Sequence, residues 1–184
     1  MTTLTISNIS DKVDIGEFTD FAYELPSIRK LAPDLPLDPE VTKVTEKYFN
    51  TQNNCNFIAF ADQDDVPLLP WHIFDDIFDL NYKSFCIINQ PPGQYINPHF
   101  DTYIGYCERN GVSTEHADQI QRHIIFLDDW HWGEMFCFPN NTFTDWKKGD
   151  VISWPYKTWH STANAGLKNR VVLTITGVPK KIKQ

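Results

Sequence analysis

The stretch RHIIFLDDWHWGEMFCFPNNTFTDWKKGDVISWP, residues 122–155, holds three short apolar runs separated by turn-forming residues. Short strands at this close spacing are typical of β-sandwiches and β-barrels. The pattern continues on both sides, in SFCIIN (84–89), QYINPHFDTY (94–103) and RVVLTITGV (170–178). We therefore predict one domain over residues 1–184, mainly β with flanking α. Its core over residues 84–178 is expected to be a double-stranded β-helix, or jelly roll.

Residues 1–80 have a mixed pattern that predicts helical and loop support packed outside this core. The proline-rich segment 25–40 is expected to be a loop, and Asp38 and Pro39 mark the start of a helix over 40–49. The run NFIAFA (56–61) predicts a strand. The run PWHIFDDIFDL (70–80) predicts a short amphipathic helix with four side chains facing inward, namely Trp71, Phe74, Ile77 and Phe78.

The composition restricts the class of protein. Hydrophobic residues make up 41% of the 184 residues, so the chain can bury a core, and the net charge is −8. An acidic chain is a poor non-specific binder of nucleic acid or of an anionic membrane. The sequence shows no secretory signal pattern and no apolar run long enough to span a membrane, which predicts a cytoplasmic protein. The four cysteines form no CxxC pair, which favours reduced, buried thiols over a disulfide framework or a zinc knuckle.

An ionisable pair, His99 and Asp101, lies within the apolar run 94–103. Alternate residues of a strand point to the same face, so both side chains can reach one metal ion, with Tyr103 on that face. A third ligand is available in His160, where the run DVISWP (150–155) gives way to a predicted loop. Two imidazoles and one carboxylate on one face form the facial triad of non-haem iron oxygenases. Tyr103 and Trp154 each suit either the wall of the pocket or, more commonly for such residues, the plain core.

Other histidines fit a metal site less well. His116 and Asp118 repeat the HxD spacing, but their neighbours are polar and show no strand pattern, so a solvated pair is expected. His72 lies on the predicted short helix, and His123 is expected to serve packing or the surface. His131, between two tryptophans, suits either a pocket mouth or a structural role.

Arg170 opens the last strand, ten residues after His160. A buried guanidinium is costly without a partner, and its forked geometry suits a carboxylate. The partner is either an internal Asp or Glu, or the far carboxylate of a small diacid. Arg122 either supports the metal site from behind or forms a pair on the sheet surface.

Four segments together resemble the iron(II)- and 2-oxoglutarate-dependent dioxygenases, and most closely their prolyl-4-hydroxylase-like branch. In chain order they are GQYINPHFD, RHIIFLDDWHWGEMFCF, WKKGDVISWP and WHSTANAGLKNR. They supply the HxD motif, a distal histidine and a basic residue ten positions later. The resemblance covers residues 84–178.

The resemblance implies roles for six residues. His99, Asp101 and His160 match the ligands of Fe(II), and Arg170 matches the residue that holds the C5 carboxylate of 2-oxoglutarate. Tyr95 matches an aromatic residue near the site, and Gln90 replaces the co-substrate tyrosine of the branch. Two further departures are Ile125 in place of a threonine and Arg170 in place of the usual lysine. The pocket for 2-oxoglutarate is therefore expected to be rebuilt locally.

The implied reaction is hydroxylation of a C–H bond with O2, releasing succinate and CO2. The carboxylate of Asp101 favours hydroxylation over halogenation, because related halogenases lack it. The substrate is a peptide, with proline as one candidate, or a small molecule. Two alternatives stay open: a zinc hydrolase that uses the same three ligands, and a jelly-roll binding module without catalysis. The sequence leaves the substrate and the oligomeric state undetermined.

Overall fold

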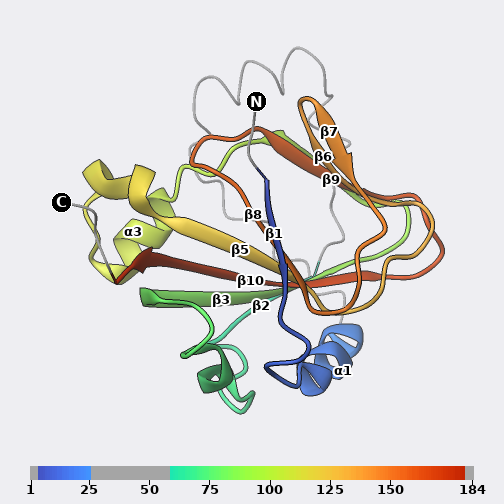
Figure 1. The fold of residues 1–184 in the computed structure, drawn as a ribbon, viewed down its shortest axis with the longest axis horizontal. Coiled ribbons are helices and arrows are strands. Elements are labelled where there is room, and N and C mark those ends of the chain that lie inside the picture. The colour runs from blue at the N-terminus through green and yellow to red at the C-terminus, as the bar shows by residue number, and fades with distance from the viewer. Residues whose placement is uncertain (1–3, 26–58, 181–184) are drawn as a thin grey trace.

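Two antiparallel sheets form the body of the protein in the computed structural model, which describes residues 4–25 and 59–180 (Figure 1). The larger sheet has six strands in the order β1 (Thr5–Asn8), β8 (Asp150–Ser153), β5 (Gln121–Phe126), β10 (Arg170–Pro179), β3 (Leu80–Gln90) and β2 (Ala59–Asp62). The smaller sheet has the order β4 (Tyr95–His99), β9 (His160–Asn164), β6 (Glu134–Phe138) and β7 (Asn141–Phe143). The helical elements are α1 (Gly16–Glu24), η2 (Trp71–Phe74), α3 (Ile104–Asn110) and η3 (Thr114–Gln119).

The strand order identifies the fold. From β3 to β10 the chain passes back and forth between the sheets, so that β8-β5-β10-β3 forms one layer and β4-β9-β6-β7 the other. Two four-stranded antiparallel layers with these crossings are a double-stranded β-helix, or jelly roll. Strands β1 and β2 extend the larger layer at its two edges. The predicted fold class is confirmed.

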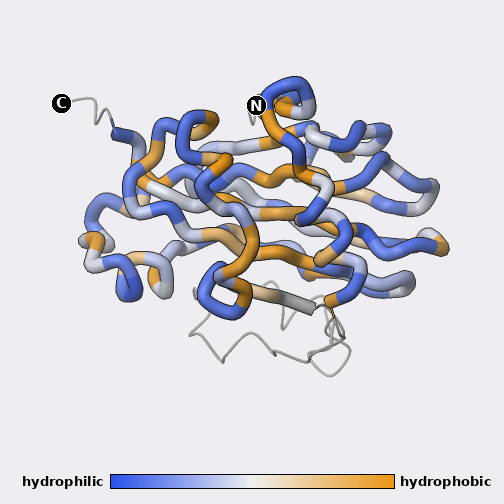
Figure 2. Tube along the Cα trace, turned by 90° about the horizontal axis from the view of Figure 1, so that it is seen from below, coloured by the Kyte–Doolittle hydropathy of each residue, from blue (hydrophilic) through white to orange (hydrophobic). Residues whose placement is uncertain are grey.

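The helical support lies on the outer face of the larger sheet, as predicted (Figure 1). In α1, Phe18 and Ala22 stand four residues apart and are fully buried against β3 and β10. The cluster around Phe18 and Ala22 is one hydrophobic core, and another, which includes Phe126, Phe136 and Trp146, fills the space between the sheets. Figure 2 shows hydrophobic segments within the layers and hydrophilic loops at their ends.

The predicted strand 94–103 is too long. Strand β4 ends at His99 after a register shift between Ile96 and His99. Pro98 lies within that shift and has no backbone N–H to donate to the ladder. Tyr103 then adopts a left-handed backbone, with φ of 59°, and caps α3. Tyr103 therefore does not share a strand face with His99, contrary to the expectation.

Two other local predictions need correction. His160 is the first residue of strand β9 and not part of a loop. The helix predicted over 70–80 is reduced to the 3-10 turn η2, although Phe74 and Phe78 are buried as expected. Strand β2 confirms the end of the NFIAFA run, whereas the helix predicted at 40–49 lies outside the described residues.

Candidate metal centre

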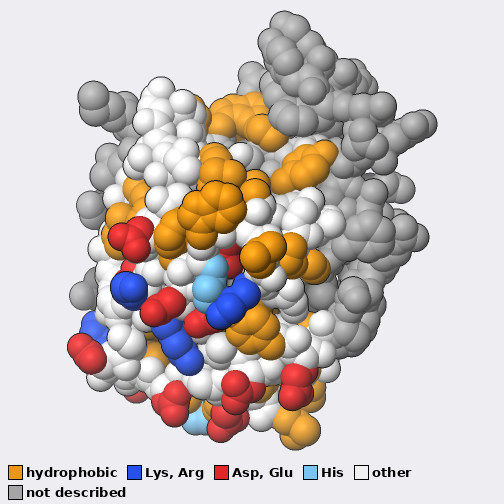
Figure 3. Space-filling view, turned by 90° about the vertical axis from the view of Figure 1, so that its right-hand side faces the viewer, with side chains coloured by type: hydrophobic (Ala, Val, Ile, Leu, Met, Phe, Trp, Pro, Cys, Tyr) orange, Lys and Arg blue, Asp and Glu red, His pale blue; other side chains and the backbone are white. Residues whose placement is uncertain are grey.

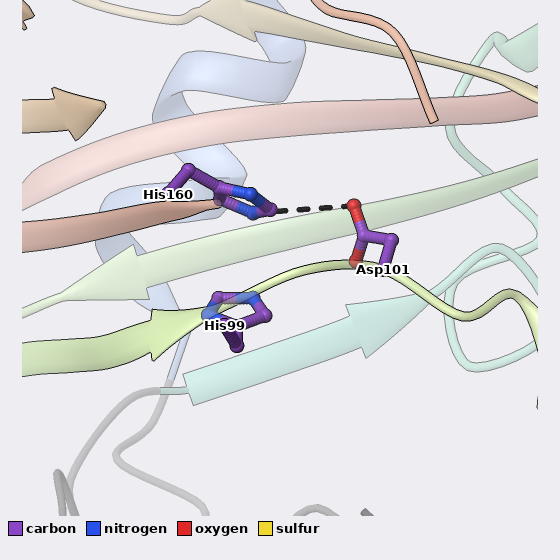
Figure 4. Close-up of side chains that lie close together, drawn as sticks. All are labelled: His99, Asp101 and His160. Atoms are coloured by element: carbon purple, nitrogen blue, oxygen red, sulfur yellow. Dashed lines mark ion pairs between the residues drawn. The ribbon is translucent and has the colours of Figure 1, made fainter. Parts of the chain in front are cut away.

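Three predicted ligands converge at one end of the smaller sheet (Figure 4). His99 ends β4 and His160 begins β9, and the antiparallel register pairs these two residues directly. Asp101 lies two residues beyond the end of β4. One ligand atom from each of the three lies within 4.8 Å of the others. Within the described part of the chain, this is the group of side chains that could hold a metal ion.

Backbone carbonyls fix the orientation of both imidazoles. Nδ1 of His99 lies 2.7 Å from the Asn97 carbonyl oxygen, and Nδ1 of His160 lies 2.9 Å from that of Thr158. A carbonyl oxygen can only accept, so Nδ1 of each ring carries the proton in these hydrogen bonds. The Nε2 lone pair of each ring is then free for a metal ion, the usual arrangement of histidine ligands.

Asp101 is held from behind by Arg122. Nη1 of Arg122 donates to Oδ1 of Asp101 at 2.6 Å, and Nε donates to Oγ1 of Thr176 at 3.1 Å. The second carboxylate oxygen, Oδ2, is buried without a hydrogen-bond partner and lies 3.9 Å from Nε2 of His160. Of the two contacts considered for Arg122, the one to the candidate ligand Asp101 is observed. The unsatisfied Oδ2 therefore lies on the side of the carboxylate nearer His160 and could bind an ion there.

The electrostatics of the three residues suit a divalent cation. Burial, together with the neighbouring His99, lowers the pKa of His160 to about 4, so this imidazole is neutral at pH 7. Burial alone would raise the pKa of Asp101, but Arg122 and the two histidines outweigh it and lower that pKa below its ordinary value. The site therefore offers the Asp101 anion and the neutral imidazole of His160, in the protonation states that metal binding requires.

Aromatic side chains enclose the centre. The ring of Trp154 lies 4.6 Å from that of His160, and the ring of Phe136 stacks on His160 at 6.0 Å. Trp154 belongs to the hydrophobic core and also contacts the candidate site, so both positions considered for it apply. Tyr103 approaches it indirectly, because the Arg122 guanidinium lies 5.2 Å from its ring centroid. Apolar walls of this kind exclude water from a reactive metal.

Arg170 is buried between the sheets, with 3% of its surface exposed. Its Nε donates to Oε1 of Gln90 at 2.7 Å, and Oγ1 of Thr162 donates to the same oxygen at 3.2 Å. No Arg170 nitrogen comes within 4.0 Å of a carboxylate of the described residues, and Nη1 has no hydrogen-bond partner. Within the described part of the chain, Arg170 therefore does not form the internal salt bridge considered from the sequence.

The guanidinium and the metal centre share one interior. The Cζ atom of Arg170 lies 5.5 Å from the ring centroid of Phe136, which in turn stacks on His160. Burial lowers the pKa of Arg170 to about 10, so the side chain stays cationic at pH 7. Gln90 belongs to this interior as well. Tyr95 is half-buried on β4 opposite Ala163, and its proposed role towards the co-substrate stays a prediction.

The remaining histidines lie away from the centre. His116 and Asp118 are exposed on η3, and His72 is exposed on η2. His123 packs its ring 4.7 Å from that of Phe78, and burial lowers its pKa to about 4, which agrees with a packing role. The described cysteines are free thiols, as expected. Three surface hollows, lined in part by Lys12, Val13 or Lys83, also lie away from the triad.

Glu134 is a buried acid that the sequence reasoning missed. Only 2% of its surface is exposed, and it points inward from the start of β6. The signal was present in the run GEMFCF, because Glu134, Phe136 and Phe138 alternate along a strand and must share a face. An acid in phase with two core phenylalanines predicts an internal carboxylate.

The fold and the site define a double-stranded β-helix protein with a His–Asp–His centre that could bind a metal ion. No family model matches the chain. No curated protein matches it either. No helix among the described residues has the length and apolar character needed to cross a membrane.

Solved structures resemble the chain at low identity. A predicted oxalate decarboxylase of Thermotoga maritima is 16% identical over 66% of this chain and 80% of its own, with a TM-score of 0.40. A cupin domain of Bordetella pertussis is 12% identical over 52% and 80%, with a TM-score of 0.37. A putative sugar phosphate isomerase of Acidithiobacillus ferrooxidans is 18% identical over 57% and 55%, with a TM-score of 0.37. Such low values carry no conclusion about activity, and the fold assignment rests on the strand order.

Proposed function

We propose that the protein is an iron(II)- and 2-oxoglutarate-dependent oxygenase that hydroxylates a C–H bond and releases succinate and CO2. One observation carries the proposal. Three side chains that could hold a metal ion and a buried guanidinium with an unpartnered Nη1 lie close to the same ring, because both His160 and Arg170 contact Phe136. A metal alone explains the triad, but an anion beside it is needed to explain Arg170.

The donor set fits iron. Asp101 offers a buried oxygen without a hydrogen-bond partner, and both histidines have Nδ1 engaged elsewhere. Two imidazoles and one carboxylate leave coordination positions open on an iron(II) ion, as oxygenases require. His99, Asp101 and His160 would hold this ion.

The interior also fits a dicarboxylate. The fork of Arg170 can bind a carboxylate through Nη1 while Gln90 keeps Nε in place. A monocarboxylate bound at the metal would leave that donor unsatisfied. A short diacid such as 2-oxoglutarate would reach both, which favours the oxygenase over a zinc hydrolase.

When bound, iron and 2-oxoglutarate together would use O2 to supply the oxidant that breaks the C–H bond. The chain itself contributes position and environment. Asp101 balances the charge of the cation, Arg122 fixes the direction of that carboxylate, and Trp154 and Phe136 keep water away. We propose a peptide, with proline as one candidate, or a small molecule as the substrate.

Succinate release tests the proposal. The iron-loaded protein is incubated with 2-oxoglutarate and pools of peptides or metabolites, and mass spectrometry searches for a gain of one oxygen. Turnover with iron and none with zinc supports the oxygenase. Hydrolysis with zinc, or binding of pool components without any succinate, would point to the two alternatives.

Two variants sharpen this test. Arg170→Ala should raise the 2-oxoglutarate concentration needed for turnover by about two orders of magnitude and leave iron binding intact, since a buried charge-assisted contact is lost. His160→Ala should abolish turnover and weaken metal binding. An unchanged co-substrate requirement in Arg170→Ala would refute the role of Arg170.

A further inference from the structure

Two unsatisfied polar atoms of opposite character occur in the interior beside Phe136. Nη1 of Arg170 is a buried donor without a partner, and Oε1 of Glu134 is a buried acceptor without one. The connecting contacts place these residues near each other. Glu134 pairs in register with Asn164, whose amide donates to the Gln90 carbonyl at 2.8 Å, and the Gln90 side chain holds Arg170. Leaving a buried guanidinium nitrogen unsatisfied is costly, which indicates a missing ligand at Nη1, whereas Oε1 of Glu134 has the unpartnered Nδ1 of His131 3.5 Å away.

The other contacts of Glu134 connect it through His131 to polar groups at the protein surface. Oε2 accepts from the His131 backbone N–H at 3.2 Å, and Oε1 lies 3.5 Å from Nδ1 of the same residue. Nε2 of His131 lies 3.1 Å from Nζ of Lys168 and 4.0 Å from Oδ2 of Asp128, which accepts from the Tyr23 hydroxyl at 2.6 Å. Figure 3 shows acidic and basic side chains intermixed on one face of the molecule, with hydrophobic side chains beside them. His131 thus lies between Glu134 and exposed polar groups.

The co-substrate pocket lacks two donors that the resemblance leads one to expect. Gln90 stands in place of a tyrosine, and Ile125 in place of a threonine. The Oε1 atom of Gln90 is already occupied by Arg170 and Thr162, and its Nε2 donates to the Gln94 carbonyl at 2.9 Å. Gln90 therefore has little capacity left for a second carboxylate contact, and another donor has to come from elsewhere.

Building on the proposed function, we propose that Glu134 and Arg170 together bind the distal carboxylate of 2-oxoglutarate, with the carboxylic acid form of Glu134 as the second donor. An ionised Glu134 would repel the incoming carboxylate, whereas its acid form donates one hydrogen bond to it. Burial raises the pKa of Glu134, although His131 and Arg170 oppose this. The protons balance as follows from the two species: the co-substrate binds as a dianion, and the Glu134 carboxylate takes one proton from solvent. Formation of the complex therefore takes up one proton.

Calorimetry measures that proton directly. 2-Oxoglutarate is titrated at pH 8 into protein loaded with Mn(II), which supports binding without turnover, in Tris and in HEPES. The dependence of the observed enthalpy on buffer ionisation should give an uptake of about one proton in the wild type. Glu134→Gln should take up none, and its Kd should not change with pH and should be no weaker than that of the wild type at pH 8, because the amide donates without first taking up a proton. His131→Gln should keep the uptake.

A second measurement covers the case in which Glu134→Gln does not fold. In the wild type, Kd should rise by up to about tenfold per pH unit once free Glu134 is ionised, because binding requires its proton. Binding without proton uptake and with a constant Kd would overturn the inference alone. Loss of the uptake in His131→Gln would assign the proton to His131 and overturn it as well. No binding of 2-oxoglutarate at all would refute the proposed function itself.

Discussion

Replacing Arg122 with methionine should destabilise the metal-free protein strongly and the metal-loaded protein much less. The 2.6 Å contact with Asp101 is a short, charge-assisted hydrogen bond, and the side chains of Arg122 and Asp101 are only 28% and 12% exposed. Methionine keeps most of the apolar stem, so the change removes charge and hydrogen bonds more than packing. It leaves the Asp101 carboxylate buried, with neither oxygen hydrogen-bonded to the protein.

The structure sets the size of the effect. Removing one partner of a buried ion pair costs about 3–5 kcal/mol, and the partial exposure of Arg122 places this pair near about 3 kcal/mol. For a chain of this length, 3 kcal/mol corresponds to a fall in Tm of roughly 6–12 °C. A bound divalent cation compensates the carboxylate directly, so saturating Mn(II) should recover much of that loss.

Differential scanning calorimetry of the two proteins, each with and without Mn(II), measures both effects. Arg109→Met is the matched control, because Arg109 is an exposed arginine on α3 and its replacement should change the stability by less than about 0.5 kcal/mol. If Arg122→Met were as stable as this control, Asp101 would not depend on Arg122. A loss of equal size with and without Mn(II) would show that Asp101 does not face the ion.

Three further predictions concern pH, backbone and packing. The pKa values of His160 and His123, both about 4, lie below the ordinary 6.5. Because the unfolded chain binds these protons first, the metal-free protein should lose stability as pH falls from 6.5 towards 4. Chemical denaturation at a series of pH values measures this loss, and His123→Phe should lose less stability over the same range than the wild type. Gly133→Ala should either unfold the protein or lower its free energy of unfolding by more than about 4 kcal/mol, because Gly133 has a φ of +94° and an added Cβ would lie 2.4 Å from the backbone nitrogen of Gly166. Gly93 also has a positive φ, +79°, but open space around it, so Gly93→Ala should lower the same free energy by about 1 kcal/mol. Gln90→Leu should lower the free energy of urea unfolding by about 2–3 kcal/mol and weaken 2-oxoglutarate binding, because Nε of Arg170 loses its hydrogen-bond acceptor. An unchanged free energy and an unchanged affinity would refute the role of Gln90 in holding Arg170.

The fold could be predicted from the sequence because the signal is local. Runs such as RHIIFL and RVVLTITGV carry the apolar content of buried strands, and the turns between them contain glycine, proline and asparagine. Strand β9 was not predicted by this reasoning. Its sequence HSTAN is polar, yet His160, Thr162 and Asn164 all point inward, where hydrogen bonds and the proposed metal satisfy them. A functional strand in the core need not look hydrophobic.

The candidate site was predictable in its members and not in its supporting contacts. The HxD spacing and the resemblance identified His99, Asp101 and His160, and the structure brings them together. The hydrogen bond from Arg122 on β5 to Asp101, just beyond the end of β4, joins residues 21 positions apart, so only the tertiary fold reveals it. The Glu134–Arg170 arrangement likewise depends on a register that no local pattern contains.

Anaerobic equilibrium dialysis with Fe(II) tests the central claim most directly, namely that these three side chains hold one metal ion. The wild type and His116→Ala, which removes the exposed HxD histidine, should each retain one ion per chain. Asp101→Ala and His160→Ala should retain little or none while keeping the β-rich circular dichroism of the wild type. Retention of a full equivalent by His160→Ala, or none by the wild type, would contradict the account.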